Sequence, residues 1–141
     1  MGSCDLCDAF NEEFRFICDN ESSFCLVNIE PIKEGHVMVL PKRHVIDKKD
    51  LNLKESKDLF NLIDKLQNTL KTSYGEDPLI IMNTGRHCTQ EHLHFHLLPS
   101  KGGLRKLYSN SENLPERIGG DKEMLGRIRD LVKDNLNFSS K

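Results

Sequence analysis

Three histidines alternate with apolar residues in one short stretch, EHLHFHLLPS, where His92, Leu93, His94, Phe95 and His96 follow one another. In an extended strand successive side chains point to opposite faces, and neighbours on one face lie roughly 6–7 Å apart. The pattern therefore predicts a strand with all three imidazoles on one face and apolar side chains on the other. Burying three unpartnered polar rings is costly. Because imidazole titrates near neutral pH, the histidine face is interpreted as a reactive site.

The rest of the composition limits the classes of protein to which the chain can belong. It has 141 residues, 30% of them charged, with a formal net charge of −2. A single domain of this size can fold around one core, and so little net charge makes nucleic acid an unlikely partner. No apolar run approaches the roughly 20 residues that cross a bilayer. Five cysteines, an odd number, argue against a complete disulfide framework, so we expect a cytoplasmic protein.

The apolar pattern along the chain predicts an α+β fold, in which a meander of strands is covered by helices. Strands are predicted over residues 13–18, 23–29, 36–41, 79–84 and 92–98, and helices over 53–73 and 121–136. Asn52 and Glu55 have the spacing of a capping box at the start of the first helix. Apolar residues at helical spacing are Leu59, Phe60, Leu62, Ile63, Leu66 and Leu70 in the first helix, and Met124, Leu125, Ile128, Leu131 and Val132 in the second.

The histidine motif and an upstream segment together resemble one known family. The chain has His-x-His-x-His over residues 92–96, preceded by LVNIEPIKEGHVMVLPKRH over residues 26–44 and IIMNTG over residues 80–85. These segments are similar to those of the histidine triad (HIT) family of nucleotide-binding proteins, zinc-containing type. The resemblance covers roughly residues 4–103 and implies a five-stranded antiparallel sheet with two main helices, usually in a homodimer.

The resemblance also implies the chemistry and the residues that perform it. Family members cleave or transfer at the α-phosphate of a nucleotide, and the middle histidine, His94, would be the nucleophile that forms a nucleotidyl-histidine intermediate. His96 and His36 would donate hydrogen bonds to the phosphate oxygens. Three further residues match nucleotide-binding positions of the family: Asn28, Asn83 and Thr89. Many members have Gly-Gln-Ser/Thr before the triad, whereas this chain has His87, Cys88 and Thr89.

A second predicted site involves metal. Cys4 and Cys7 have the CxxC spacing that supplies half of a tetrahedral zinc site. In zinc-containing members of the family, and in the related galactose-1-phosphate uridylyltransferases, a later histidine and the first triad histidine complete the set. Carried onto this chain, these are His44 and His92. Four protein ligands leave no position for a catalytic water, so the zinc would be structural.

Two other functions are compatible with the residues alone. His92 and His94, at i and i+2 in a strand, could share one zinc ion and make the protein a zinc-dependent hydrolase, given a third ligand and an open position. The departure from Gly-Gln-Ser/Thr also allows a nucleotide-binding regulator with weak catalysis. Retention of a covalent adduct after quenching would separate nucleophilic from metal catalysis.

The expected domain limits follow from the part of the chain that the resemblance covers. Residues 1–103 are expected to form the HIT-like catalytic domain with its N-terminal zinc segment, and residues 104–141 an extension with a helix that packs on the same domain. The chain continues well past the triad as LLPSKGGLRKLYS. This continuation is more similar to the branch that cleaves dinucleoside polyphosphates, so the expected substrate is a purine nucleotide or a dinucleoside polyphosphate.

Overall fold

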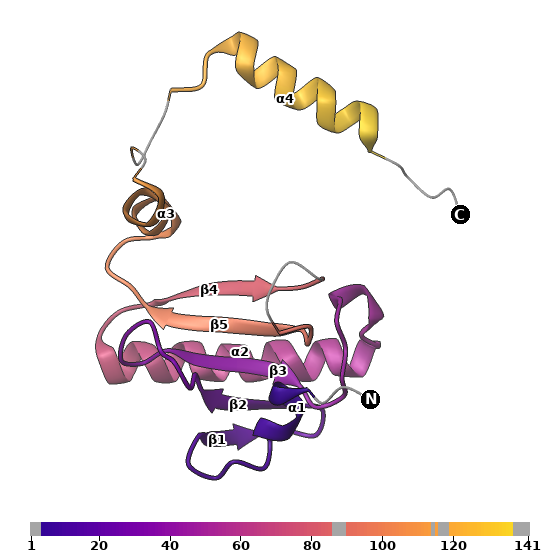
Figure 1. Cartoon of the computed structure of the whole chain (residues 1–141), viewed down its shortest axis with the longest axis vertical. Helices are drawn as coiled ribbons and strands as arrows, with labels where there is room; N and C mark the ends of the chain where they lie inside the picture. Colours follow the sequence, from indigo (N-terminus) through magenta and orange to yellow (C-terminus); the bar gives the residue numbers. More distant parts are fainter. Residues whose placement is uncertain (1–3, 86–89, 114, 116–118, 137–141) are drawn as a thin grey trace. The chain divides into compact units, whose positions relative to one another are not determined.

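A computed structural model describes residues 4–85, 90–113, 115 and 119–136 of the chain. Contacts within the chain divide it into two units, residues 1–103 and residues 104–141. The first unit is built on one antiparallel sheet with the strand order β1-β2-β3-β5-β4 (Figure 1). The strands are β1 (Phe16–Asp19), β2 (Ser23–Val27), β3 (Val37–Pro41), β4 (Pro78–Asn83) and β5 (His94–Pro99).

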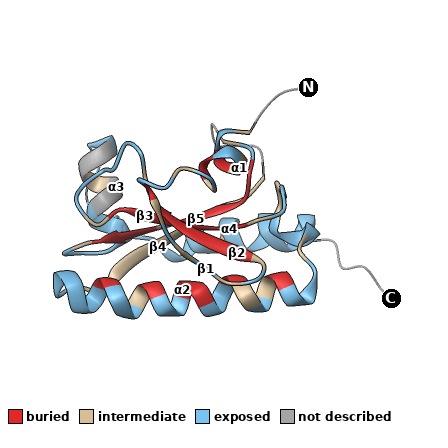
Figure 2. Ribbon diagram, turned by 90° about the horizontal axis from the view of Figure 1, so that it is seen from below, coloured by how far each residue is buried: buried red, intermediate tan, exposed pale blue. Residues whose placement is uncertain are grey.

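One face of this sheet is covered by the long helix α2 (Leu53–Tyr74), whose buried residues face the strands (Figure 2). Alternate residues of the three central strands meet the helix, and together they form the larger apolar core. Its buried members are Cys25, Val37, Val39, Leu59, Leu62, Ile63, Leu66, Leu70, Leu93, Phe95 and Leu97. Leu93, Phe95 and Leu97 therefore occupy the core side, as their alternation with the histidines predicts.

The opposite face carries a smaller core and leaves part of the sheet open. The short helix α1 (Asp5–Ala9) packs here through Leu6 and Ala9. The strand residues that it meets are Phe24, Leu26, Met38 and Leu40. On β5, His96 pairs with Met38 in the sheet register, and the two side chains share this face. The side chains of the histidine pattern therefore project from the face that α2 leaves uncovered.

Helix α2 begins and ends at residues whose chemistry suits those positions. The side chain of Asn52 accepts a hydrogen bond from the Glu55 backbone at 2.8 Å, and Glu55 accepts one from the Asn52 backbone at 3.0 Å, which confirms the capping box. Gly75 ends the helix with φ of 76° and donates its N–H to Lys71. This left-handed conformation favours glycine because it has no Cβ.

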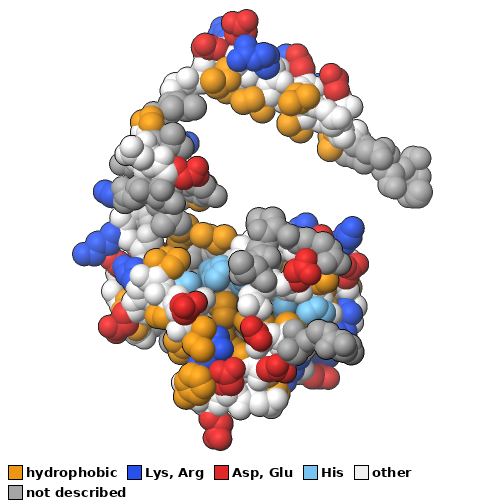
Figure 3. Space-filling view, viewed as in Figure 1, with side chains coloured by type: hydrophobic (Ala, Val, Ile, Leu, Met, Phe, Trp, Pro, Cys, Tyr) orange, Lys and Arg blue, Asp and Glu red, His pale blue; other side chains and the backbone are white. Residues whose placement is uncertain are grey.

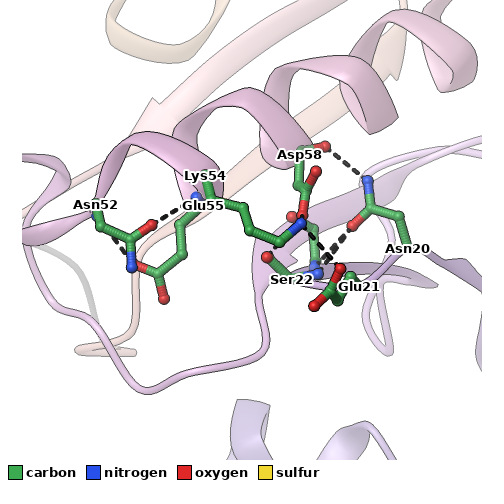
Figure 4. A network of polar contacts seen from close by, with 8 residues as sticks. Asn20, Glu21, Ser22, Asn52, Lys54, Glu55 and Asp58 are labelled. Carbon is green, nitrogen blue, oxygen red and sulfur yellow. Dashed lines mark hydrogen bonds and ion pairs between the residues drawn. The ribbon is translucent and has the colours of Figure 1, made fainter.

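The first turns of α2 are tied to the β1–β2 turn by polar contacts (Figure 4). Asn20 donates to the Asp58 backbone carbonyl at 2.7 Å, and Ser22 donates to the Asp58 carboxylate at 2.6 Å. Lys54 lies between Glu21 and Asp58 and pairs with both. These bonds fix the edge of the sheet against the helix and so help to set the plane on which the histidines lie.

The sequence predicted these elements with small errors at their ends. Strand β1 is shorter than residues 13–18, and its pairing is irregular between Phe16 and Cys18. Strand β5 begins at His94, so His92 lies two residues before it and not within it. Phe60, predicted in the buried stripe of α2, is 54% exposed and contacts Phe95 edge-to-face at the border of the core. No residue pattern had indicated α1 or α3 (Leu104–Glu112).

The second unit contains α3 and α4 (Lys122–Asn135). Helix α4 confirms the helix predicted over residues 121–136, and Asp121 caps it by accepting from the Met124 backbone at 2.8 Å. Its apolar stripe is half-buried at Met124 and exposed at Leu125, Ile128, Leu131 and Val132. That this extension packs on the catalytic domain stays a prediction. Among the described residues, no helix is both long enough and apolar enough to span a membrane.

Glu55 is expected to matter more for stability than its charged neighbours on α2. Its buried carboxylate accepts from Arg43 Nε and Nη2 at 2.8 Å and also completes the capping box. Replacing Glu55 with Ala removes charge-assisted bonds and a cap, so we expect a loss of about 2–3 kcal/mol in the free energy of unfolding by urea. Lys54→Ala, which removes only exposed ion pairs, should lower the free energy of unfolding much less. Equal losses in the two variants would contradict this ranking.

Candidate functional site

The site lies where the ends of β4 and β5 meet on the open face of the sheet. Asn83, the last residue of β4, is directly opposite His94, the first residue of β5. His96 follows on the same face, and His36 comes from the residue just before β3. Gly35 precedes His36 with φ of 97°, and a Cβ at that position would lie 2.7 Å from Pro99 Cγ. Glycine thus allows the loop that carries His36 to pass close to the end of β5.

His94 has one ring nitrogen fixed by the backbone. Its Nδ1 lies 2.6 Å from the carbonyl oxygen of His92. A carbonyl can only accept, so Nδ1 must carry the proton and donate. The other nitrogen, Nε2, then holds a lone pair in the neutral ring. His94 is only 3% exposed, yet it contributes to the wall of a cavity. A buried ring in one fixed tautomer, with an unprotonated nitrogen and a place in the wall of a cavity, is suited to be a nucleophile.

The tautomers of His36 and His96 are also fixed by hydrogen bonds, which begin at another backbone group. The Ile32 N–H donates to His36 Nδ1 at 3.1 Å, so Nδ1 is unprotonated and His36 Nε2 carries the proton. His36 Nε2 lies 2.8 Å from His96 Nδ1, which must accept. His96 Nε2 is then left with the remaining proton of its ring. The chain of bonds turns His96 into a hydrogen-bond donor beside the lone pair of His94.

Asn83 lies between these two rings. Its Nδ2 is 3.1 Å from His94 Nε2 and 3.1 Å from His96 Nε2. It can donate to His94, whose nitrogen is unprotonated. Toward His96, however, one N–H donor faces another, and neither has an acceptor in this contact. An anionic oxygen bound between these two donors would accept a hydrogen bond from each, beside the unprotonated nitrogen of His94.

Burial keeps all four rings of this region neutral near pH 7. It lowers the pKa of His94 and of His36 below the ordinary histidine value. Burial, reinforced by the neighbouring His94 and His36, lowers the pKa of His96 to about 4. Burial is also the main reason that the pKa of His92 falls to about 4. The lone pair of His94 is therefore available at neutral pH, because protonation does not compete for it.

A cavity of about 490 Å³ extends from these histidines across the open face. Besides His94, His96 and Asn83, Asn28 lines it and so joins the predicted nucleotide-binding residues. The Asn28 side chain accepts from the Glu30 backbone at 2.8 Å, which fixes the loop after β2. Figure 3 shows histidine side chains at the surface of this face of the first unit, with acidic side chains on the same face.

The structure adds lining residues to which no sequence motif had assigned a role. They are Asp5, Leu6, Asp8, Glu12, Arg15, Ile29, Glu30, Met38 and Gln90. Most come from α1 and the segment that follows it, and their proximity to the triad depends on tertiary packing alone. Of the predicted residues, Thr89 lies outside the described part of the chain, as do His87 and Cys88.

The cysteine and histidine residues predicted to bind metal come together beside this site. One ligand atom from each of Cys4, Cys7, His44 and His92 lies within 4.8 Å of the other three. Both sulfur atoms are 3.4 Å from His92 Nδ1, and Cys7 Sγ is 3.4 Å from His44 Nδ1. Ligands at ordinary zinc distances in a tetrahedron would be about 3.6 Å apart. The spacing therefore fits a small cation held by two sulfurs and two nitrogens.

The chemistry of this cluster also fits a metal. His92 Nε2 lies 2.9 Å from the Pro41 carbonyl and must donate to it, so Nδ1 presents a lone pair toward the sulfurs. Burial and the adjacent Cys4 raise the pKa of Cys7 to about 11. A bound cation would reverse this effect, because it stabilises thiolates. Two sulfurs and two imidazoles are ligands that zinc prefers.

The geometry argues against the alternative of one catalytic zinc shared by His92 and His94. His92 directs Nδ1 to the cysteines, whereas His94 uses Nδ1 to bond the His92 carbonyl. Within the described residues, the cluster that could hold a metal includes His92 and excludes His94. The two rings therefore serve different sites, although they are two residues apart.

Known proteins are similar to this chain in sequence and in fold. The adenosine 5'-monophosphoramidase HNT1 of Candida albicans is 28% identical over 95% of this chain and 91% of its own length. The bis(5'-adenosyl)-triphosphatase of Dictyostelium discoideum is 31% identical over 83% of this chain and 85% of its own length. The crystal structure of a HIT family protein from Bacillus subtilis superposes with a TM-score of 0.68 at 17% identity, over 98% of this chain and all of the other.

A match to the family as a whole covers the same sheet and its histidines. The description HIT domain applies to residues 10–103, which include every strand and α2. The five-stranded antiparallel sheet was expected on the resemblance of short segments that include the histidine motif, and this match extends over two thirds of the chain. The chain belongs to the HIT family.

Proposed function

We propose that this protein is a nucleotide hydrolase or nucleotidyl transferase that acts at the α-phosphate of a purine nucleotide through His94. The observation that carries the proposal is the fixed tautomer of His94, in which the His92 carbonyl accepts from Nδ1–H and leaves Nε2 unprotonated in a ring that lines the cavity. The names of the relatives, a phosphoramidase and a diadenosine triphosphatase, support the same reaction class.

The reaction would proceed in two displacements at phosphorus. In the first, His94 Nε2 forms a bond to the α-phosphorus while the bond to the leaving group breaks, and the leaving group departs with that electron pair and takes up a proton. In the second, the oxygen of water or of another acceptor bonds to phosphorus, the nitrogen–phosphorus bond breaks, and the acceptor loses a proton. Two displacements replace one harder step, and a neutral His94 returns.

The neighbouring donors would stabilise the charge on the phosphate oxygens. His96 Nε2–H and Asn83 Nδ2 converge beside His94, and a non-bridging oxygen placed between them would accept from both. His36 acts through His96, because it holds the proton on the outward nitrogen. Asn28, at the cavity wall, would contact the ribose. Thr89 is proposed near the leaving group on the resemblance alone.

We also propose that zinc occupies the four-residue cluster and acts structurally. Cys4 caps α1 by accepting from the Cys7 backbone at 3.3 Å, so the ion would join this helix to the segment before β5. With four protein ligands it would supply cross-linking and no catalytic water. The residue that it restrains, His92, is the residue whose carbonyl holds His94.

A homodimer is proposed from the exposed edge of the sheet. Strand β4 lies at one end of the strand order and has no neighbour beyond it within the described chain. Its residues, PLIIMN, are half-buried throughout. An apolar edge strand with free backbone groups favours pairing with another strand. Cytoplasmic localisation also stays a prediction.

Replacing His94 with Asn should abolish turnover while leaving nucleotide binding. The nucleophilic lone pair is lost, and we expect a decrease in kcat of at least about 10³-fold. The measurement is hydrolysis of nucleoside phosphoramidates and dinucleoside triphosphates, next to nucleotide affinity by calorimetry. His96→Ala, which removes a donor and leaves the nucleophile in place, should lose less, on the order of 10²-fold. A folded His94→Asn protein that turns over normally would refute the nucleophile assignment.

Trapping the intermediate distinguishes this reaction from direct attack by water. The enzyme is denatured without acid while it turns over a radiolabelled nucleotide. The label should remain on the wild-type chain and be absent from His94→Asn. Turnover that continues with no adduct at any time point would instead support direct hydrolysis.

The metal can be measured independently of activity. Purified protein should contain about one zinc per chain, and Cys7→Ser should lower both the zinc content by elemental analysis and the melting temperature. Cys18→Ser is the matched control, because Cys18 lies in β1 outside the cluster. Zinc content that is unchanged in Cys7→Ser, or absent from wild-type protein, would count against the site.

Stability should fall as the pH is lowered below the histidine range. The pKa of His96 is about 4 in the folded chain and near 6.5 when unfolded. Between these values the unfolded state binds more protons, so the free energy of unfolding rises with pH from about 4 to 6.5 and is then level. Urea unfolding at several pH values should show this slope, and His96→Asn should reduce it. A titration of His96 near pH 6.5 by NMR would be the contrary result.

A further inference from the structure

A buried arginine at the far end of the nucleotide cavity has no part in the proposed chemistry. Arg15 is 7% exposed and lies immediately before β1. Its Nε donates to the Val27 carbonyl at 3.0 Å, and its Nη1 lies 3.4 Å from Glu12 Oε2. Both Arg15 and Glu12 line the cavity that contains His94 and His96.

The guanidinium of Arg15 has N–H donors that these two contacts do not use. Burying a charge is costly unless its hydrogen bonds are satisfied. Arginine has five N–H donors, and the two contacts above use Nε and Nη1. Within the described part of the chain, no acceptor lies within hydrogen-bond distance of Nη2. A ligand in the cavity could therefore receive bonds from a cation that is already held in place.

The position of Arg15 corresponds to the end of the ligand opposite the phosphate. Three strand spacings separate β5, which carries His94, from β1, a distance of roughly 14 Å. Between them the cavity wall is formed partly by Leu6, Ile29 and Met38, which are suited to the flat face of a base. If the phosphate binds at His94, as the proposed function requires, the base extends toward Arg15.

The charges of the cavity argue that Arg15 meets a base and not a second phosphate. Glu12 contacts Arg15 directly, and three further carboxylates line the same cavity: Asp5, Asp8 and Glu30. Together they outnumber the single guanidinium and would repel a polyphosphate chain. They are good acceptors, however, for the N–H groups of a neutral base.

A guanidinium beside carboxylates matches guanine better than adenine. Guanine offers the acceptors O6 and N7 to an arginine, and its N1–H and amino group are donors that a carboxylate can accept. Adenine has an amino group in place of O6, so a donor would face the donors of Arg15. We propose that Arg15, with Glu12 as its acidic partner, is a specificity-determining residue that selects a guanine nucleotide over an adenine nucleotide.

Matched pairs of substrates test this selection. Guanosine and adenosine 5'-phosphoramidates, and diguanosine and diadenosine triphosphates, differ only in the base. For wild-type protein we expect kcat/KM to be about tenfold or more higher for the guanine member of each pair. In Arg15→Met the ratio should fall toward one. Lys42→Met is the control, because Lys42 pairs with Asp19 and lies outside the cavity lining; its ratio should stay at the wild-type value.

A second variant and a binding measurement test the proposal even if Arg15 is needed for folding. If Arg15→Met does not fold, Glu12→Gln keeps the shape of the partner and should lower the same guanine-to-adenine ratio. The affinities of wild-type protein for GMP and AMP, measured by calorimetry, test the selection without turnover. Equal affinities, a preference for adenine, or variants that slow both bases equally would overturn the role of Arg15. If the protein binds GMP more tightly than AMP but cleaves none of the substrates, only the proposed reaction would be refuted.

Discussion

The site depends on one short hydrogen bond, from His94 Nδ1 to the carbonyl oxygen of His92. The bond fixes which nitrogen of His94 carries the proton, and therefore which nitrogen can attack phosphorus. It is local in sequence, because donor and acceptor are two residues apart, but its strength depends on how firmly the backbone at His92 is held. That backbone lies just before β5, where the ladder of the sheet has not yet begun.

Two contacts from elsewhere in the chain hold His92. Its Nε2 donates to the Pro41 carbonyl at the end of β3, and its Nδ1 faces the sulfurs of Cys4 and Cys7. If zinc binds the cluster as proposed, His92 Nδ1 and the two sulfurs would be linked through the ion. A structural ion would then hold the backbone that orients His94 without touching the substrate. In the proposed reaction, the first histidine of the motif orients the backbone and the second performs the chemistry.

The polar end of the cavity and its base end differ in their electrostatics. At His94, burial keeps the rings neutral, so a phosphate bound there would meet the N–H dipoles of His96 and Asn83. At the other end, Glu12 contacts the buried guanidinium of Arg15. A nucleotide is charged at one end and neutral at the other, so this polarity favours a single direction of binding.

The sequence by itself determined the features that follow the periodicity of a single strand or helix. Alternation over residues 92–98 assigned Phe95 to the core and His94 to the open face, and helical spacing with the Asn52–Glu55 box located α2, because backbone geometry alone sets these periods. Cys4 and Cys7 were indicated by their CxxC spacing, whereas His44, His92 and His36 were assigned through similarity of whole segments to a family. Their distances could not follow from spacing, since they join residues as far apart as Cys4 and His92.

Only the tertiary structure decided what lies around the histidines. Phe60 matches the apolar stripe of α2 but falls at the border of the core, where the sheet ends. Arg15 and Glu12 have no motif, and their place in the cavity arises because α1 folds over the sheet. The tautomers of His36 and His96 depend on the Ile32 N–H, a backbone group whose direction is set by the folded loop. Pattern fixes which face a side chain occupies, whereas packing between distant segments fixes what that side chain meets.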